Sequence, residues 1–216
     1  MGRTPCGSGP SRQDVGSVGA IIPCGMSPEH PFGSPPSLAE ALAGAARQLA
    51  SAFTHSGSPS EGRVRLSSDD PSLPDVELRF LRDRRLFSRT WPLVIESAVA
   101  GQGPARSVAL ALHRRWLGRR TELRPAAGGG TEAAPWAGRF AAAGVLEGAA
   151  TMTGVQDLRL TWDPRHERWT LRIHTLAGAL IGTAPSSAIA VGFEPEDIDG
   201  LLQVLRAYRA AALSPP

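Results

Sequence analysis

Residues 157–176, DLRLTWDPRHERWTLRIHTL, decide the fold that we expect for this chain. Apolar side chains alternate with polar ones on both sides of the central segment DPRHE, namely Leu158, Leu160, Trp162, Trp169, Leu171 and Ile173. A period of two on both sides of a turn indicates two antiparallel strands joined as a hairpin. The apolar face of such a hairpin is buried against another element, so we expect helices elsewhere in the chain to cover it.

Two segments near the ends of the chain have the pattern of amphipathic helices. In residues 37–53, Ser37 and Glu40 have the spacing of a capping box, and apolar residues recur on one stripe. In residues 194–213, acidic residues gather at the start and arginines towards the end, as the helix dipole favours. The predicted buried stripe of this second helix is Ile198, Leu201, Leu202, Leu205 and Tyr208.

Five further segments have shorter patterns. The predicted strands are residues 62–68, 75–81, 85–101 and 188–193, and the predicted helix is residues 140–152. In the third of these strands Pro92 would also suit a helix start, but the β-branched residues that follow it favour a strand.

The segment 104–118 predicts a third, shorter helix. Pro104 stands where a first helical residue would, and Gly118 stands where a helix would end. A helical stripe joins Ala105, Val108, Ala109, Leu112 and Trp116.

These elements predict one α+β domain over residues 37–212, with a mainly antiparallel sheet and amphipathic helices packed on one face. Residues 125–135 are rich in Gly and Ala and predict a flexible internal connector. Residues 1–36 are dense in Gly, Pro and Ser and poor in apolar residues, which predicts a disordered tail. Met26 offers a second start, so we also hypothesise that residues 1–25 are absent from the natural protein.

The composition limits what the basic residues mean. All 23 basic residues of the 216 are arginine, and the chain has no lysine and no asparagine. Together with 24 Gly and 19 Pro this indicates codon bias in a GC-rich, bacterial genome. Such bias accounts for the identity of the basic residues but not for their placement.

The placement is uneven. Residues 79–124 contain eleven arginines and three acidic residues, a net charge of +8 in a chain whose formal net charge is only +3. We therefore predict an arginine-rich surface that binds an acidic partner, either an acidic protein face or nucleic acid. Its candidate residues are Arg114, Arg115, Arg119, Arg120, Arg82, Arg84 and Arg85. The alternative is that these arginines only line solvated strand faces and a helix end.

Catalytic motifs are absent from the sequence. There is no Gly-x-Ser-x-Gly elbow and no phosphate loop, and no cysteine lies near a histidine in the predicted domain. Cys6 and Cys24 both fall in the tail, and His166 and His174 are too far apart along a hairpin arm to share a metal. We therefore expect no cofactor, no metal and, on balance, no enzyme.

Two other functions stay open. One is a small-molecule or lipid-binding module with a pocket between the C-terminal helix and the apolar sheet face of Trp162, Trp169, Leu171 and Ile173. The weaker one is an enzyme with scattered catalytic residues. The uncharged run 173–193 is interrupted by Pro185, so we expect two strands rather than a membrane span, and a soluble, cytoplasmic protein.

Overall fold

The predicted hairpin forms the centre of the sheet. In the computed structural model β8 (Val155–Asp163) and β9 (Arg168–Thr183) pair antiparallel, with Trp162 opposite Trp169 and Leu160 opposite Leu171. The structure describes residues 37–56, 62–81, 83–84, 89–114, 121–126, 132–183 and 187–214, all within one compact unit of residues 34–216. The predicted tail, residues 1–36, lies outside the described residues.

Ten strands of the described chain form one antiparallel sheet around this hairpin. Eight of them follow the order β1-β2-β3-β5-β9-β8-β6-β7, while β4 pairs with β5 and β10 with β9. The other strands are β1 (Thr54–Ser56), β2 (Arg63–Ser67), β3 (Val76–Phe80), β4 (Asp83–Arg84), β5 (Arg89–Ala100), β6 (Val108–Arg114), β7 (Thr121–Pro125) and β10 (Ser187–Ala190). The strands predicted over residues 62–68, 75–81 and 85–101 are therefore confirmed, and the one predicted at 188–193 is confirmed in its first part.

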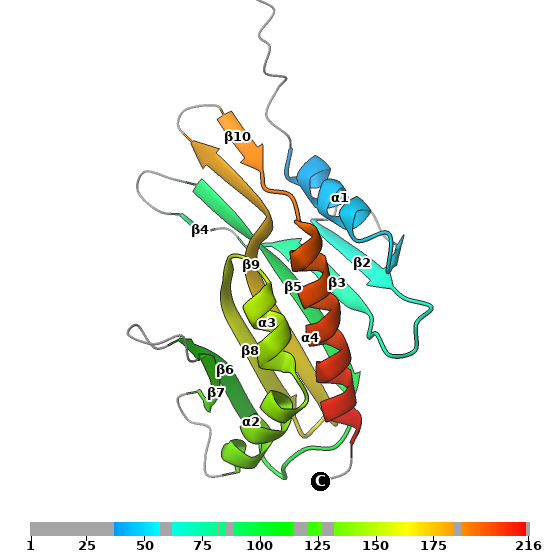
Figure 1. Cartoon of the computed structure of the whole chain (residues 1–216), viewed down its shortest axis with the longest axis vertical. Coiled ribbons are helices and arrows are strands. Elements are labelled where there is room, and N and C mark those ends of the chain that lie inside the picture. The colour runs from blue at the N-terminus through cyan, green and yellow to red at the C-terminus, as the bar shows by residue number, and fades with distance from the viewer. Residues whose placement is uncertain are drawn as a thin grey trace, which may run out of the picture. The chain divides into compact units, whose positions relative to one another are not determined.

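Four helices lie on one face of this sheet (Figure 1). They are α1 (Leu38–Gln48), α2 (Ala133–Ala142), α3 (Val145–Thr151) and α4 (Pro195–Leu213). The long α4 crosses β5 and β9, α1 covers β2 and β3, and α2 covers β6 and β7. The predicted α+β class, with an antiparallel sheet and helices on one face, is confirmed.

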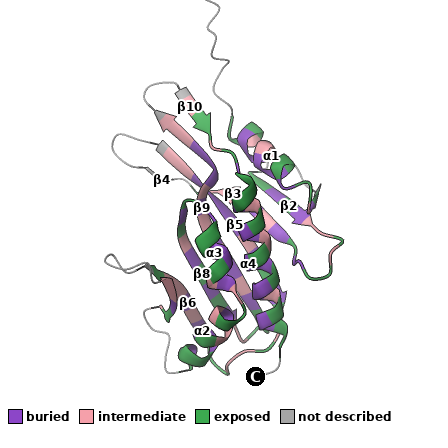
Figure 2. Ribbon diagram, viewed as in Figure 1, coloured by how far each residue is buried: buried purple, intermediate pink, exposed green. Residues whose placement is uncertain are grey.

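The core lies between the helices and the inner face of the sheet (Figure 2). Trp169 is fully buried, and its ring lies 4.9 Å from the ring of Phe140 and 5.4 Å from that of Trp162. The Tyr208 hydroxyl donates a hydrogen bond to the Trp169 carbonyl at 2.6 Å, which ties α4 to β9. Aromatic rings therefore fill the space under the hairpin.

Both amphipathic helices begin as their sequences predict. Ser37 and Glu40 form the capping box of α1, with each side chain accepting from the other residue's backbone N–H. In α4, the buried Asp197 accepts from the Glu194 backbone N–H at 3.1 Å, and from the Thr153 N–H and hydroxyl at 2.6 Å each. The carboxylate of Asp197 thus fastens the start of α4 to the turn before β8.

The third predicted helix, over residues 104–118, is wrong. Val108–Arg114 is β6, which pairs with β8 on one side and β7 on the other. Val108, Leu110 and Leu112 also satisfy a period of two, and pairing with two partner strands favours that period over the helical one. Pro104 opens no helix, and its carbonyl accepts from the Trp162 indole N–H at 2.8 Å. Trp116 and Gly118 lie outside the described residues.

Three other predictions concern shorter segments. The helix predicted at residues 140–152 is interrupted at Gly144, whose φ of 99° belongs to the left-handed region, so two helices form instead of one. Of the connector predicted at residues 125–135, Pro125 ends β7, Ala126 donates to the Ala109 carbonyl and residues 133–135 belong to α2, while residues 127–131 lie outside the described residues. The two strands predicted in the uncharged run 173–193 are confirmed as the second part of β9 and as β10. Among the described residues, no helix combines the length and the apolar composition of a membrane span.

Candidate binding surface

The seven candidate arginines lie in and beside two connections between strands. Arg84 ends β4 and Arg114 ends β6, and only their backbones are described. The other five, Arg82, Arg85, Arg115, Arg119 and Arg120, lie outside the described residues. Their role therefore stays a prediction. The described ends of β4, β5 and β6 show only where the two arginine-rich connections join the sheet.

The strand ends beside the two connections face the same direction but lie at different heights along the sheet (Figure 1). Strand β6 runs parallel in direction to β9 and opposite to β5, so the end of β6 and the start of β5 point the same way. Arg89 lies opposite Gly182 of β9, whereas Arg114 of β6 is level with about His174 of β9 through the registers of β6 on β8 and of β8 on β9. At about 4.8 Å between strands and about 3.3 Å per residue, the backbones of Arg89 and Arg114 are roughly 30 Å apart. Both arginine-rich segments thus leave the sheet in the same direction, at positions well separated along the strands.

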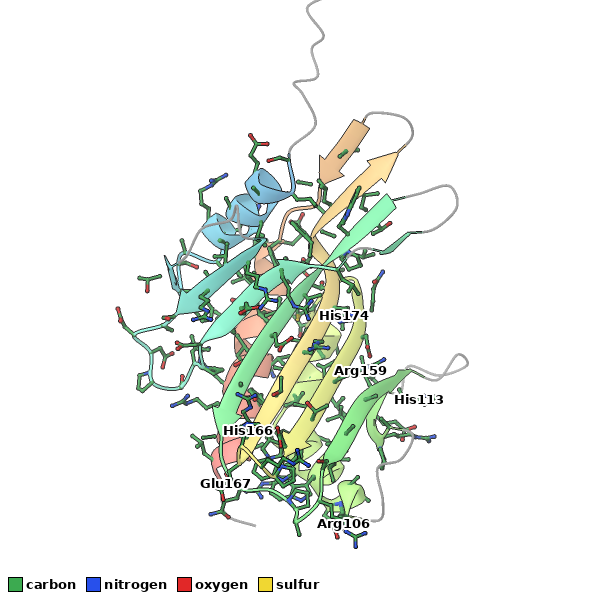
Figure 3. The ribbon with its side chains drawn as sticks, turned by 180° about the vertical axis from the view of Figure 1, so that it is seen from behind. Arg106, His113, Arg159, His166, Glu167 and His174 are labelled. Atoms are coloured by element: carbon green, nitrogen blue, oxygen red, sulfur yellow. The ribbon has the colours of Figure 1, made fainter. Side chains whose placement is uncertain are left out.

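The face of the sheet opposite the helices carries charged side chains in register (Figure 3). Across seven strands one row contains Arg65, Glu77, Glu96, Arg172, Arg159, Ala111 and Arg124. The row arises because each strand turns alternate residues away from the core. We call this surface the open face.

Several described arginines of the open face pair with carboxylates. Glu96 Oε2 lies 3.3 Å from Nη2 of Arg79 and 2.8 Å from Nη2 of Arg172. Other pairs join Arg63 to Glu77 at 3.3 Å, Arg159 to Asp157 at 2.7 Å and Arg124 to Glu122 at 2.6 Å. Partly exposed pairs of this kind contribute little stability. They do make the open face a mosaic of positive and negative charges. For these residues the structure therefore agrees with the alternative stated above, that the arginines only line a solvated strand face.

The histidines are spread over the fold. His174 lies on the open face opposite Val94 and Asp157, and its pKa is lowered chiefly by partial burial, with Arg172, Arg159 and Arg79 adding to the effect and Asp157 opposing it. His166 lies at the hairpin turn, where Nδ1 is 2.6 Å from Asp163 Oδ2 and this hydrogen bond lowers the pKa of Asp163. Among the described residues, no group of three or more His, Cys, Asp or Glu could hold a metal ion.

The apolar sheet face at which we expected a pocket is buried. Trp162 is 5% exposed, and Trp169, Leu171 and Ile173 are fully buried. Trp136 and Phe140 of α2 pack against Trp169 with ring centroids 5.3 and 4.9 Å away. These four apolar residues therefore belong to the hydrophobic core.

A hollow of about 510 Å³ lies elsewhere, between the end of α1, the β2–β3 connection and α4. Phe53, Leu73 and Leu202 contribute its apolar lining, and Asp69, Asp70 and Arg206 are among its polar lining residues. The carboxylate of Asp69 has no ion pair or hydrogen bond with the described residues.

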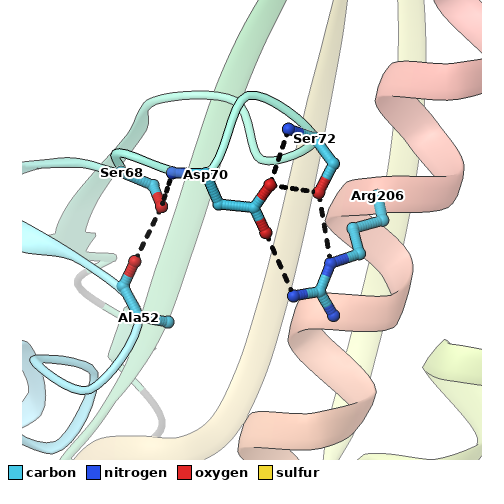
Figure 4. A network of polar contacts seen from close by, with 5 residues as sticks. All are labelled: Ala52, Ser68, Asp70, Ser72 and Arg206. Atoms are coloured by element: carbon cyan, nitrogen blue, oxygen red, sulfur yellow. Dashed lines mark hydrogen bonds and ion pairs between the residues drawn. The ribbon is translucent and has the colours of Figure 1, made fainter.

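A polar network closes one side of the hollow (Figure 4). Asp70 Oδ1 accepts from the N–H and the hydroxyl of Ser72 at 2.8 and 2.6 Å, and these bonds are the main reason that the pKa of Asp70 is lowered. Arg206 of α4 donates to Asp70 Oδ2 and to the Ser72 hydroxyl, both at 3.3 Å. Asp70 is the turn former that its Ser/Pro-rich surroundings predict. Its link to Arg206 could not be predicted because 136 residues separate the two.

Comparisons with known proteins add one match. The model of a family described as protein of unknown function (DUF3156) matches residues 47–212, which include every strand from β1 to β10, both α2 and α3, and nearly all of α4. Neither the curated proteins nor the solved structures gave a match. Because the matched residues make up well over half of the chain, the protein belongs to the DUF3156 family.

Proposed function

We propose that the protein is a non-catalytic, cytoplasmic binding protein that contacts an acidic segment of another protein. The contact surface comprises the two arginine-rich connections, with Arg82, Arg84 and Arg85 in one and Arg114, Arg115, Arg119 and Arg120 in the other. One observation supports this proposal: β5 begins and β6 ends in the same direction, so both connections leave the sheet that way. An extended segment of about nine residues spans the roughly 30 Å between them, so seven arginines can act on one partner.

The mosaic of the open face favours a protein partner over nucleic acid. A polyanion gains affinity from a surface of one sign, and carboxylates among the arginines repel it. Glu77, Glu96 and Asp157 interleave with arginines over the open face. A protein partner can match both signs.

The experiment compares two sets of arginine-to-alanine substitutions that remove the same charge. The test variant changes Arg114, Arg115, Arg119 and Arg120. The control variant changes Arg63, Arg65, Arg159 and Arg168. In the control, Arg63 and Arg65 pair with Glu77, and Arg159 pairs with Asp157. The probe is a polyglutamate peptide of about twenty residues, titrated at low and at physiological salt. We expect the test variant to lose tenfold or more in affinity and the control less than threefold.

Three outcomes would overturn this proposal. Equal losses in both variants would show that only net charge matters. Unchanged affinity in the test variant would place the binding surface elsewhere. Tighter binding of a short DNA duplex than of polyglutamate, with a steep salt dependence that the test variant loses, would identify nucleic acid as the partner.

A second candidate function, small-molecule binding, is favoured by the hollow beside α4. An apolar lining of Phe53, Leu73 and Leu202 next to the carboxylate of Asp69, which no described residue pairs, suits a small amine with an apolar body. Benzylamine is a suitable probe, with benzyl alcohol as the uncharged control. We expect chemical-shift changes at the hollow with benzylamine that Asp69→Asn reduces, and identical responses to the two probes would contradict this function.

A further inference from the structure

Strand β10 has an open edge with an unusual composition. It pairs with β9 on one side, and no described strand pairs with it on the other. Its sequence, Ser-Ala-Ile-Ala, carries no charge. Ile189 is 65% exposed, more than any other large apolar side chain of the described residues. An uncharged edge with an exposed isoleucine is a template for pairing with another strand.

The other edges of the described sheet are protected. Strand β7 carries Glu122 and Arg124 and ends at Pro125, and charges and proline both hinder pairing at an edge. Strand β4 is short, with two charged residues, and β1 is short, with three polar residues. Strand β10 has four residues and carries neither a charge nor a proline, so its edge is the least protected of the described sheet.

The hydrogen-bonding groups of β10 alternate in direction. Ile189 lies opposite Ile181 of β9, and Val191 donates its N–H to the Ala179 carbonyl at 2.8 Å. In an antiparallel ladder every second residue points its N–H and C=O at the same neighbour. Residues 189 and 191 therefore bond towards β9, while Ala188 and Ala190 direct their backbone groups to the open edge.

We propose that this edge pairs with β10 of a second copy of the chain, antiparallel, about a two-fold axis at Ile189. The segment Ala188-Ile189-Ala190 is the same from either end, so the axis sets Ile189 opposite its own copy. Ala188 of each chain then lies opposite Ala190 of the other, and the two pairs form four backbone hydrogen bonds. A two-fold interface needs such self-complementarity, and an uncharged strand does not repel its copy. This inference does not rest on the proposed function.

The proposed pairing fixes the distances that a disulfide can test. Residues opposite each other in a pair without hydrogen bonds have Cα atoms about 4.5 Å apart, within the range that a disulfide spans. Ile189→Cys, in a chain with Cys6→Ser and Cys24→Ser, should therefore form a disulfide-linked dimer under mild oxidation. Ala188→Cys in the same background is the control, because its copy lies about 8 Å away, beyond that range.

Sedimentation velocity supplies a second measurement on the unmodified chain. A four-residue strand pair buries less surface than stable complexes do, so the mass should rise from 22.7 kDa towards twice that value only with concentration. Ile189→Lys should keep the protein monomeric at every concentration. Leu213→Lys, at a 51% exposed position of α4, should leave the association unchanged.

Each contrary result would overturn the inference. A wild-type chain that stays monomeric at several hundred micromolar would do so, as would a dimer that Ile189→Lys does not weaken. Equal cross-linking at positions 188 and 189 would indicate random collision rather than the proposed register. A disulfide from the Ile189→Cys variant to another protein, with none between its own copies, would assign the edge to a different partner.

Discussion

At the scale of single residues, the tyrosine of α4 shows how one polar group is accommodated in the core. Tyr208 is fully buried, and its hydroxyl donates at 2.6 Å to the Trp169 carbonyl and lies 3.3 Å from the Ser97 carbonyl. Burial raises the pKa of Tyr208 well above its ordinary value. The hydroxyl therefore stays protonated and acts as a donor between two strands.

Removing this hydroxyl tests its contribution. We expect Tyr208→Phe to lower the free energy of unfolding by about 1–2 kcal/mol, because a buried carbonyl loses its hydrogen-bond donor while the ring packing is kept. Urea denaturation followed by tryptophan fluorescence measures the change. An unchanged midpoint would show that another group or a water replaces the hydroxyl.

His174 predicts a pH dependence of stability on the open face. Its pKa in the folded protein is lowered from the ordinary value of 6.5, chiefly because partial burial disfavours the charged ring. The folded state thus binds the proton less readily than the unfolded chain, so stability should fall as the pH drops through about 6.5 and level off below the folded pKa. Above that window both states are neutral and no effect remains.

The measurement compares melting temperatures of the wild type and His174→Gln between pH 5 and 8. The variant should lose part of the decline that the wild type has between pH 7 and pH 5. Asp70 and Asp163 have lowered pKa values and act at lower pH, where they should give both proteins the same decline. Parallel curves from pH 8 to pH 5 would contradict the role of His174.

At the scale of elements, the sequence predicts those whose pattern is local. The capping box of Ser37 and Glu40, the acidic start of α4 and the alternation around DPRHE each act within a few residues, and all three elements form as predicted. The prediction for β6 failed because its apolar residues fit both periods. The pairing of β6 with β8 and β7 decided between them, and that pairing is not local.

The packing of α3 on α4 depends on two glycines that no sequence pattern marks. A Cβ on Gly200 would lie 2.8 Å from the Gly148 carbonyl oxygen, and a Cβ on Gly148 would lie 2.8 Å from the Gly200 carbonyl oxygen. Both obstacles are backbone atoms, so a larger residue at either position must push the helices apart.

Alanine at this crossing should therefore destabilise the protein. We expect Gly200→Ala to cost about 1–3 kcal/mol of unfolding free energy through overpacking. Gly138→Ala in α2 is the control, because no atom lies within 4 Å of its added Cβ; it should stabilise by about 0.5–1 kcal/mol through helix propensity. Chemical denaturation of both variants checks the prediction, which a destabilisation of the same size in both would refute.

The second prediction at this scale concerns Asp197, which caps the start of α4. Its buried carboxylate accepts three hydrogen bonds, two from Thr153 and one from Glu194. Asp197→Ala should lower the free energy of unfolding by about 2–3 kcal/mol, since it removes a cap and leaves buried donors unpaired. Glu196→Ala, at an exposed position one residue earlier, should change it by less than about 0.5 kcal/mol. Similar losses in the two variants would mean that net charge at the helix start, not the cap, matters.

At the scale of the whole molecule, the sequence predicts which arginines form the candidate surface but not how the fold arranges them. Clustering along the chain marked the segments around Arg84 and Arg114, while only the strand pairing shows that both leave the sheet in the same direction. The pairing of arginines with carboxylates on the open face could not be predicted from the sequence either. Glu96 and Arg172 are 76 residues apart and meet because β5 and β9 pair.

The distribution of the core predicts the folding unit. Every buried apolar side chain of the described residues lies between Ala41 and Ala212, and the cap of α1 begins at Ser37. We therefore propose that residues 37–212 are the domain, and we expect a chain of residues 37–216 to unfold in one cooperative transition. Its melting temperature should lie within about 2 °C of the full-length value, because the segment removed contributes none of the described core. Calorimetry of the two chains checks this. A large drop would mean that residues 1–36 pack on the domain, and the same drop in a chain of residues 26–216 would further assign that contribution to residues 1–25.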